Sequence, residues 1–288
     1  MLARSDSVRS DKEGVRAGKA IAVANQKGGV GKTTTTVNLG ACLASLGKRV
    51  LCVDLDPQGH TSVGFGIEKE RLERTVYQLL MAKGAARDAI LPSAVDGLYV
   101  LPSNIQLAGA EVELLQELAR EVRLRDALAP VKNQYDFILI DCPPSLGQLT
   151  VNGLAAADSV LVPIQGEYYS LEGLALLLNT IRAIKERVNS DLHLEGILLT
   201  MFDRRTNLGS QVAEEVRKHF GDRVYDVTVP RNVRLSEAPS HGQPIIYYDP
   251  RSRGAEAYLQ LAKEVIEHAK EGPGQGPGGD SGRRRQQH

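Results

Sequence analysis

The chain has 288 residues, 42% of them hydrophobic but only 5% aromatic, so we expect a sizeable and largely aliphatic core. Its 35 basic and 35 acidic side chains cancel, which excludes a global electrostatic attraction to nucleic acid or anionic membrane and leaves only local patches. The three cysteines lie far apart without a C-x-x-C pair, a pattern typical of a reducing cytoplasm. No apolar run approaches the ~18 residues that a membrane-spanning helix needs.

The polarity of the chain divides it into three parts. Residues 1–18 are polar and mixed in charge, and they lack the apolar segment of a signal peptide, so we expect a flexible arm. Residues 271–288 are rich in glycine and proline, which predicts a disordered tail. Between them, over residues 19–270, short apolar runs alternate with helical patterns. This alternation predicts one α/β domain with a mostly parallel, doubly wound sheet flanked by helices.

The predicted elements follow one another along this central part. Strands are predicted over residues 20–25, 49–54, 98–101, 135–141, 159–164, 195–202 and 223–229. Helical spacing of apolar side chains predicts helices over residues 32–46, 107–128, 171–187, 207–220 and 255–269. We interpret the apolar stripe of the last helix as a surface that faces the core.

The glycine-rich stretch NQKGGVGKTTTT, residues 25–36, lies between the first strand and the first helix, which is the context that a phosphate loop needs. Its glycines let backbone N–H groups turn toward an anion, and the helix N-terminus adds partial positive charge. Lys32 is expected to reach the β- and γ-phosphates of a nucleotide, and Thr33 to place its hydroxyl on Mg²⁺. The predicted nucleotide contacts are Lys27, Gly28, Gly29, Val30, Gly31, Lys32, Thr33 and Thr34.

The loop departs from the usual G-x-x-x-x-G-K-[ST] pattern, because Gln26 stands where the first glycine belongs and Lys27 follows it. Lys32 is already expected to bind the phosphates, so Lys27 needs another role. The spacing alone supports two roles for Lys27 equally. It is a solvated lysine that supports its own site, or it reaches across a dimer to the partner's phosphates as a residue supplied in trans.

Three aspartates lie at the ends of predicted strands or just after them. Asp54 and Asp56, two positions apart, can face the same way at the carboxyl end of their strand, where ligands of open α/β sheets bind. One of them is a candidate to orient an attacking water, although aspartates are also common in turns. The buried run FILID ends in Asp141 and reads as a Walker B strand that delivers a carboxylate to Mg²⁺, through water.

These motifs carry a family resemblance. KGGVGKTT resembles the deviant phosphate loop of the ParA/MinD group of ATPases, and from about residue 20 to 270 the chain resembles chromosomal ParA of the Soj type. The segments that carry the wider resemblance include VDLDPQGHTSVGFGI, FILIDCPPSLGQLTVN, GILLTMFDRRTNLGSQV and VPRNVRLSEAPSHGQPIIYYDPRSRGAEAY.

The resemblance implies an Mg²⁺-dependent ATPase whose ATP-bound form is a homodimer with the nucleotides sandwiched between the chains. It favours the cross-dimer role for Lys27, assigns the hydrolytic water to Asp56 and lets Asp54 support the magnesium region. Lys27, Lys32 and Asp56 are then the expected catalytic residues, and Thr33, Asp54 and Asp141 the expected metal site. By matching position, Pro230 and Asn232 are expected near the adenine.

The resemblance also implies partners. The dimer is expected to bind double-stranded DNA without sequence preference, through Arg205 and Arg234, and to release it after slow hydrolysis that a ParB-type centromere-binding protein stimulates. Phosphate contacts of this kind carry affinity without sequence information. The expected location is cytoplasmic and nucleoid-associated, and the expected function is partitioning of a chromosome or plasmid.

Two other functions stay open. A MinD-like regulator of cell division would associate with the membrane through a C-terminal amphipathic helix, whereas this chain ends in glycine, proline and polar residues. A redox enzyme resembling the nitrogenase iron protein would need cysteines placed to bridge a cluster between subunits. Cys142 directly follows the Walker B aspartate, and Cys42 and Cys52 lie in predicted core elements.

Overall fold

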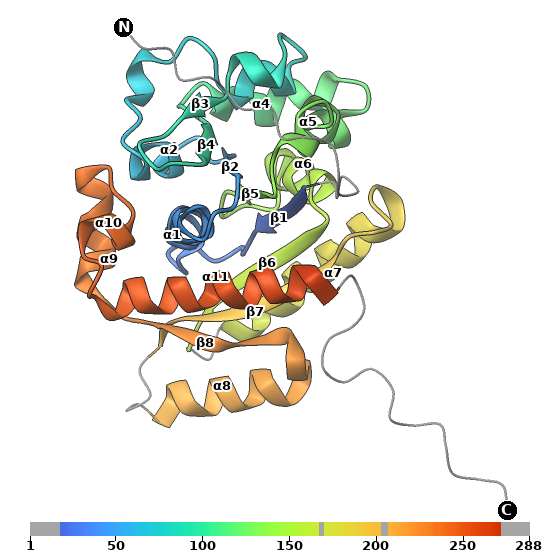
Figure 1. The fold of residues 1–288 in the computed structure, drawn as a ribbon. Coiled ribbons are helices and arrows are strands. Elements are labelled where there is room, and N and C mark those ends of the chain that lie inside the picture. The colour runs from blue at the N-terminus through green and yellow to red at the C-terminus, as the bar shows by residue number, and fades with distance from the viewer. Residues whose placement is uncertain (1–17, 167–169, 203–206, 272–288) are drawn as a thin grey trace, which may run out of the picture.

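The computed structural model describes residues 18–166, 170–202 and 207–271. Within them, one eight-stranded sheet runs in the order β3-β4-β2-β5-β1-β6-β7-β8, with helices on both faces (Figure 1). Every strand pair is parallel except β3 with β4. The fold class predicted from the sequence is thereby confirmed. The predicted arm up to residue 17, the tail from residue 272 and Arg205 lie outside the described residues.

The strands are β1 (Lys19–Val23), β2 (Val50–Asp54), β3 (Leu91–Pro92), β4 (Leu98–Leu101), β5 (Phe137–Asp141), β6 (Ser159–Gln165), β7 (His193–Phe202) and β8 (Val224–Pro230). The helices are α1 (Lys32–Ser45), α2 (His60–Gly64), α3 (Val76–Leu80), α4 (Leu107–Glu113), α5 (Arg123–Leu128), α6 (Gln148–Ala156), α7 (Ser170–Arg187), α8 (Asn207–Phe220), α9 (Val233–Glu237), α10 (Ile245–Tyr248) and α11 (Arg253–Glu271). Each predicted strand is present, within two residues of its expected bounds. The sequence analysis missed β3, α2, α3, α6, α9 and α10.

Two apolar cores lie on the two faces of the sheet. Side chains alternate along β1, so that Ala20 and Ala22 enter one core and Ile21 and Val23 the other. Helices α1 and α11 cover the second face (Figure 1). Because β2 and β5 are buried along their whole length, both read as continuous apolar runs in the sequence.

The apolar stripe of α11 faces the core, as predicted. Tyr258, Leu261 and Val265 are each at most 1% exposed, and the Tyr258 hydroxyl lies 3.2 Å from the Thr35 hydroxyl of α1. The apolar face of α11 is therefore buried against the rest of the domain.

The single helix predicted over residues 107–128 is wrong. Helix α4 ends at Glu113, two 3-10 turns follow, and α5 starts at Arg123. The chain leaves the helical path at Ala119, whose φ of 50° lies in the left-handed region. The continuous apolar periodicity of the segment did not reveal this break.

Candidate functional site: a nucleotide site at the carboxyl ends of the strands

The phosphate loop connects β1 to α1 at the carboxyl edge of the central strands (Figure 1). Gly29 and Gly31 have φ values of 74° and 93°, a backbone conformation that side chains with a Cβ rarely adopt. Gly31 is also the N-cap of α1, and as a glycine it has no side chain to cap that end of the helix. The first N–H groups of α1 are thus available to an anion.

Lys32 lies in the first turn of α1 and is only 7% exposed. Its ammonium donates a hydrogen bond to the Lys27 carbonyl across the loop, at 3.2 Å. Burial lowers the pKa of Lys32, while the nearby charge of Asp141 acts in the opposite direction. A buried ammonium with one carbonyl partner is suited to pair with phosphate oxygens.

Three side-chain hydrogen bonds join the loop to the strands β6 and β7. The Thr200 hydroxyl donates to the Val30 carbonyl at 2.7 Å, and the Gln165 amide donates to the Gly29 carbonyl at 2.9 Å. The Asn25 amide donates to the carbonyl of Pro163 in β6. The sequence analysis missed Gln165 and Thr200, whose only signal is their place at the ends of two strands.

Asp54 and Asp141 are register partners at the ends of β2 and β5, and both are fully buried. Burial raises the pKa of Asp54 to about 6 and that of Asp141 to about 7, and the Asp54 charge adds to the rise at Asp141. The sequence placed both aspartates at strand ends, and the register brings them side by side.

Two residues at the start of α2 hold these carboxylates. The Ser62 backbone N–H and hydroxyl both donate to Asp54 Oδ2, at 2.8 and 2.7 Å. The Thr61 hydroxyl donates to Asp141 Oδ2 at 2.7 Å, and the Thr33 hydroxyl of the loop donates to the same oxygen at the same distance. Thr61 and Ser62 were not predicted, although their hydroxyl side chains shortly after the Asp56-Pro-Gln-Gly turn are the signal that locates them.

The other oxygen of Asp141 shows that the site suits a cation. Asp141 Oδ1 is buried and has no hydrogen-bond partner among the described residues. A buried carboxylate oxygen in this state is normally satisfied by an ion or a water. With the Thr33 hydroxyl next to it, the site offers the hard oxygen ligands that Mg²⁺ prefers.

Asp56 and Lys27 lie at the rim of the site. Asp56 is half-buried, and its carboxylate accepts the Gln58 N–H at 2.9 Å in a local turn. The Lys27 backbone N–H donates to the Asn25 side chain at 2.9 Å, and its side chain is half-buried. Both residues therefore stand beside the buried carboxylates and Lys32.

A cavity of about 480 Å³ opens beside the loop. Thr33 and Thr34 line it on one side, and Pro230, Asn232 and Met201 on the other. The structure thus brings the predicted adenine-side residues to the phosphate loop, across about 200 positions of sequence. The Asn232 side chain also accepts the Arg234 N–H at 2.8 Å, which caps α9.

Arg234 lies on the surface beside this cavity. Its side chain is 55% exposed and pairs with Glu237 at 2.8 Å and with Asp249 at 3.6 Å. The hydrogen bond that Arg234 donates to the Glu237 carboxylate raises the pKa of Arg234. Any phosphate that binds this guanidinium competes with two acids that it already contacts.

A phosphate loop after a central parallel strand, with two register-paired carboxylates at the ends of β2 and β5, defines a P-loop nucleotide-binding protein. The comparisons with known proteins narrow this class. The family model described as "AAA domain" matches residues 18–194.

Two relatives, one named Soj and one named ParA, identify the family. The chain is 63% identical to the sporulation initiation inhibitor protein Soj of Bacillus subtilis, covering 86% of this chain and 98% of the relative. It is 53% identical to the chromosome partitioning protein ParA of Myxococcus xanthus, covering 90% and 91%. The chain belongs to the ParA/Soj family of chromosome-partitioning ATPases.

A solved structure supports the fold. The chain resembles a structure titled cobyrinic acid a,c-diamide synthase of Mycobacterium smegmatis with bound ADP and magnesium. The two are 38% identical with a TM-score of 0.78, and the match covers 90% of this chain and 97% of the other.

Proposed function

We propose that the chain is a DNA-partitioning switch driven by ATP. Two copies join around two ATP molecules, the pair binds double-stranded DNA without sequence preference, and slow hydrolysis releases it. The observation that carries this proposal is the meeting of Lys32, Thr33 and the two buried carboxylates around an uncapped helix N-terminus. The sequence identity to Soj and ParA proteins supports the proposal that the cargo is a chromosome or plasmid.

ATP and Mg²⁺ fit the residues of the site. Lys32 would hold the β- and γ-phosphates, with the loop backbone from Gly28 to Thr34 around them. Thr33 and Asp141 would hold the metal, because Asp141 Oδ1 has no hydrogen-bond partner in the described part of the chain, while Asp54 supports this region. When bound, the ion neutralises charge on the phosphates. The similar solved structure from Mycobacterium smegmatis, which has ADP and magnesium bound, supports this choice.

The catalytic roles follow from position at the rim. Asp56 orients the water, since it is the half-buried carboxylate next to two fully buried ones. Lys27 reaches the nucleotide of the partner chain, because Lys32 already occupies the inside of its own loop. Pro230 and Asn232 border the adenine in the cavity beside the loop.

The proposed DNA contacts are Arg205 and Arg234. Arg234 is exposed, and two copies in a dimer would double a patch that is weak in one chain. Affinity for DNA then depends on ATP, which ties location on the nucleoid to the nucleotide state. A ParB-type protein would complete the slow site and speed hydrolysis, as partner proteins do for other nucleotide switches.

The membrane-associated alternative is less favoured by the structure. Helix α11 buries its apolar face against α1 and β8, so that face is not presented to an interface. Among the described residues, no helix combines the length and apolar character needed to span a bilayer.

Retention of duplex DNA tests the proposal, measured with ATP, with ADP and without nucleotide, each with Mg²⁺. We expect retention with ATP only, and its loss as salt is raised. Equal retention in all three states would refute the switch. Recruitment to anionic liposomes with ATP, without DNA retention, would favour the membrane alternative.

A further inference from the structure

The loop that follows Asp141 ends on a carboxylate from a distant helix. Glu111 of α4 accepts the Gln148 N–H at 2.8 Å and the Leu149 N–H at 3.3 Å, at the start of α6. A helix leaves its first N–H groups without an internal partner, and negative charge at this end is favourable. Glu111 therefore fixes the first turn of α6.

The contact requires glycine at position 147. The φ of Gly147 is −84°, a value open to any residue, so the backbone conformation does not demand glycine. A Cβ at this position, however, would lie 2.5 Å from Oε2 and 2.7 Å from Oε1 of Glu111. Any other side chain at position 147 would therefore displace the carboxylate from the helix. The contact can thus be disturbed from either of its two sides.

The body of α6 lies directly on the ends of β2 and β5, the strands that carry the two buried carboxylates. A Cβ on Gly153 would come within 2.7 Å of Cys142 Sγ and 3.2 Å of the Leu55 side chain, so the helix backbone contacts both. Cys142 directly follows Asp141, and Leu55 directly precedes Asp56. The Leu55 N–H also donates to the Asp141 carbonyl at 3.0 Å. The placement of α6 therefore affects the neighbours of both aspartates.

The loop between Asp141 and α6 is stiff. Residues 142–147 read CPPSLG, and the two prolines fix their own φ angles. The Cys142 N–H donates to the Val23 carbonyl of β1 at 3.2 Å, which holds the start of the loop. Glu111 holds its end. A loop of this kind absorbs little movement, so a displaced first turn of α6 shifts the residues next to Asp141.

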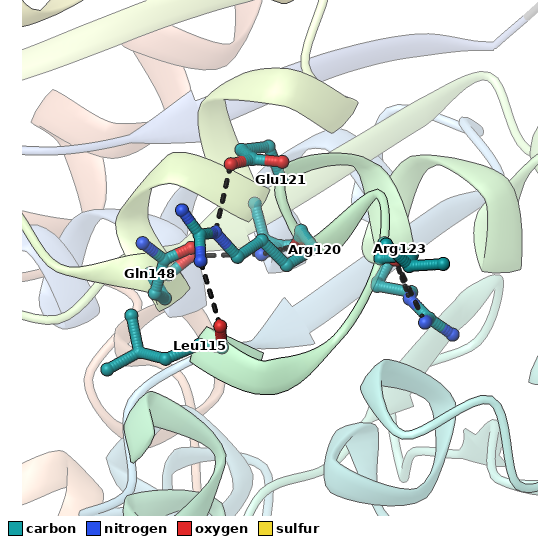
Figure 2. A network of polar contacts seen from close by, with 7 residues as sticks. Leu115, Arg120, Glu121, Arg123 and Gln148 are labelled. Carbon is teal, nitrogen blue, oxygen red and sulfur yellow. Dashed lines mark hydrogen bonds and ion pairs between the residues drawn. The ribbon is translucent and has the colours of Figure 1, made fainter. Parts of the chain in front are cut away.

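The middle of α6 has an anchor of its own. Asn152 is fully buried, and its amide donates to the Arg120 carbonyl at 2.7 Å and accepts the Leu124 N–H at 3.1 Å. The same amide donates to the Gln148 carbonyl at 3.0 Å, and Figure 2 shows Gln148 next to Arg120. These bonds do not involve Glu111. Loss of its carboxylate should therefore loosen the first turn and the loop without unfolding the helix.

We propose that Glu111 is a positioning residue for ATP hydrolysis. By capping α6, its carboxylate holds the loop after Asp141 and the strand end before Asp56 in the geometry that hydrolysis needs. The inference deepens the proposed function, and it rests on that proposal for the hydrolysis of ATP at this site.

Binding of ATP should not depend on Glu111. Lys32 and the loop glycines lie before α1, and the bonds that hold them come from β6 and β7. The Asp141 carboxylate is held by the hydroxyls of Thr33 and Thr61. Neither set of bonds includes α4 or α6, so the loss of Glu111 should act on the rate of hydrolysis and not on affinity.

The kcat of hydrolysis and the Kd for ATP test this in the full chain, with Mg²⁺ and without DNA. Glu111→Ala should lower kcat on the order of 10-fold, because small displacements caused far from the reacting atoms are costly, and it should leave the Kd unchanged. Glu111→Gln keeps one acceptor oxygen and should have an intermediate kcat. Glu113→Ala is the matched control, since Glu113 is an exposed acid of the same helix that accepts the Tyr77 hydroxyl. It should hydrolyse ATP like the parent.

A double-mutant cycle tests the contact itself. Gly147→Ala displaces the Glu111 carboxylate, so it should lower kcat about as much as Glu111→Ala does. In the double variant the new Cβ meets no carboxylate, and kcat should be no lower than in Glu111→Ala alone. Losses in kcat that multiply in the double variant would overturn the proposal.

Urea unfolding of each variant separates rate from stability. If Glu111 were only a structural cap, Glu111→Ala would unfold at a lower urea concentration but keep the parent's kcat for each folded chain. That result would overturn the proposal, as would a weaker Kd for ATP with an unchanged kcat. If Glu111→Ala does not fold, Glu111→Gln and Gly147→Ala decide by the same criteria. Failure of the parent to retain DNA with ATP would count against the proposed function alone, because hydrolysis is measured without DNA.

Discussion

Asp54 and Asp141 face each other as register partners on β2 and β5, fully buried, each held by a hydroxyl of α2. Two carboxyl groups buried side by side destabilise a folded chain unless something compensates their charge. Thr61 and Ser62 supply part of this compensation, and it is incomplete, because Asp141 Oδ1 has no hydrogen-bond partner within residues 18–166, 170–202 and 207–271. The arrangement is therefore explained by a cation, which a nucleotide brings.

Stability of the nucleotide-free chain should fall as pH rises from about 4 to about 7. An acid with a raised pKa in the folded state binds more protons folded than unfolded over this window, so its ionisation costs stability there. Asp141 has a pKa of about 7 in the folded chain, so its charge at pH 8 destabilises the parent. Asp141→Asn should therefore have a free energy of unfolding higher than the parent's at pH 8, by on the order of 2–4 kcal/mol. At pH 4 the two free energies should be nearly equal. Urea unfolding at both pH values checks this.

The control for this pH effect is Asp96→Asn, because Asp96 is exposed. It should unfold with the same pH dependence as the parent. If Asp141→Asn also kept the parent's slope between pH 4 and pH 8, the buried carboxyl would not be the source.

Thr61→Val should reduce stability, since it removes one of the two donors to Asp141 while keeping the shape of the side chain. A hydrogen bond to a buried charged group contributes about 1.5–3 kcal/mol. Thr61→Ser keeps the hydroxyl and should behave like the parent in urea unfolding. The concentration of Mg²⁺ needed for half-maximal ATP binding should rise only in Thr61→Val; the same value in both variants would refute a role at the metal.

The two lysines of the loop should fail in different ways. Lys32→Ala should lose ATP binding, because Lys32 is the only lysine of the described residues that is buried, and its ammonium bonds to the Lys27 carbonyl of the loop. Lys27→Ala should bind ATP but fail to self-associate, because its proposed contact is with the partner chain. Titration with a fluorescent ATP analogue and analytical ultracentrifugation separate the two steps. Normal self-association of Lys27→Ala would place that lysine in its own site.

DNA affinity should respond to the ion pairs of Arg234. Glu237→Gln removes the nearer acid and should raise the affinity of the ATP-bound protein a few-fold, as expected for one exposed ion pair. Arg234→Glu should self-associate but not retain DNA. Filter binding with a 60-base-pair duplex measures both. If Arg234→Glu retained duplex DNA as well as the parent does, the DNA-binding surface would not include Arg234.

Local sequence patterns predicted the parts of this molecule that depend on neighbouring residues. The apolar runs around Val50 and Phe137 gave the strands, and the glycines with Lys32 and Thr33 gave the loop. Asp54 and Asp141 were placed at strand ends because the runs before them stop there.

Features that depend on contacts between distant segments were not predictable in this way. The register that pairs Asp54 with Asp141, the donation of Thr61 to Asp141 and the brace from Thr200 join residues 80 to 170 positions apart. The break at Ala119 was hidden because the apolar spacing continues through it. Helix α6 was missed since its N-terminus takes its cap from Glu111, 37 positions earlier.

The central claim is that bound ATP joins two chains, and light scattering of Asp56→Ala tests it most directly. This variant should bind ATP without hydrolysing it, so the protein should stay in its ATP-bound state during the measurement. With saturating ATP and Mg²⁺ we predict twice the 31.2 kDa mass of one chain, and with ADP a mass of 31.2 kDa. A mass of one chain under saturating ATP would contradict the account.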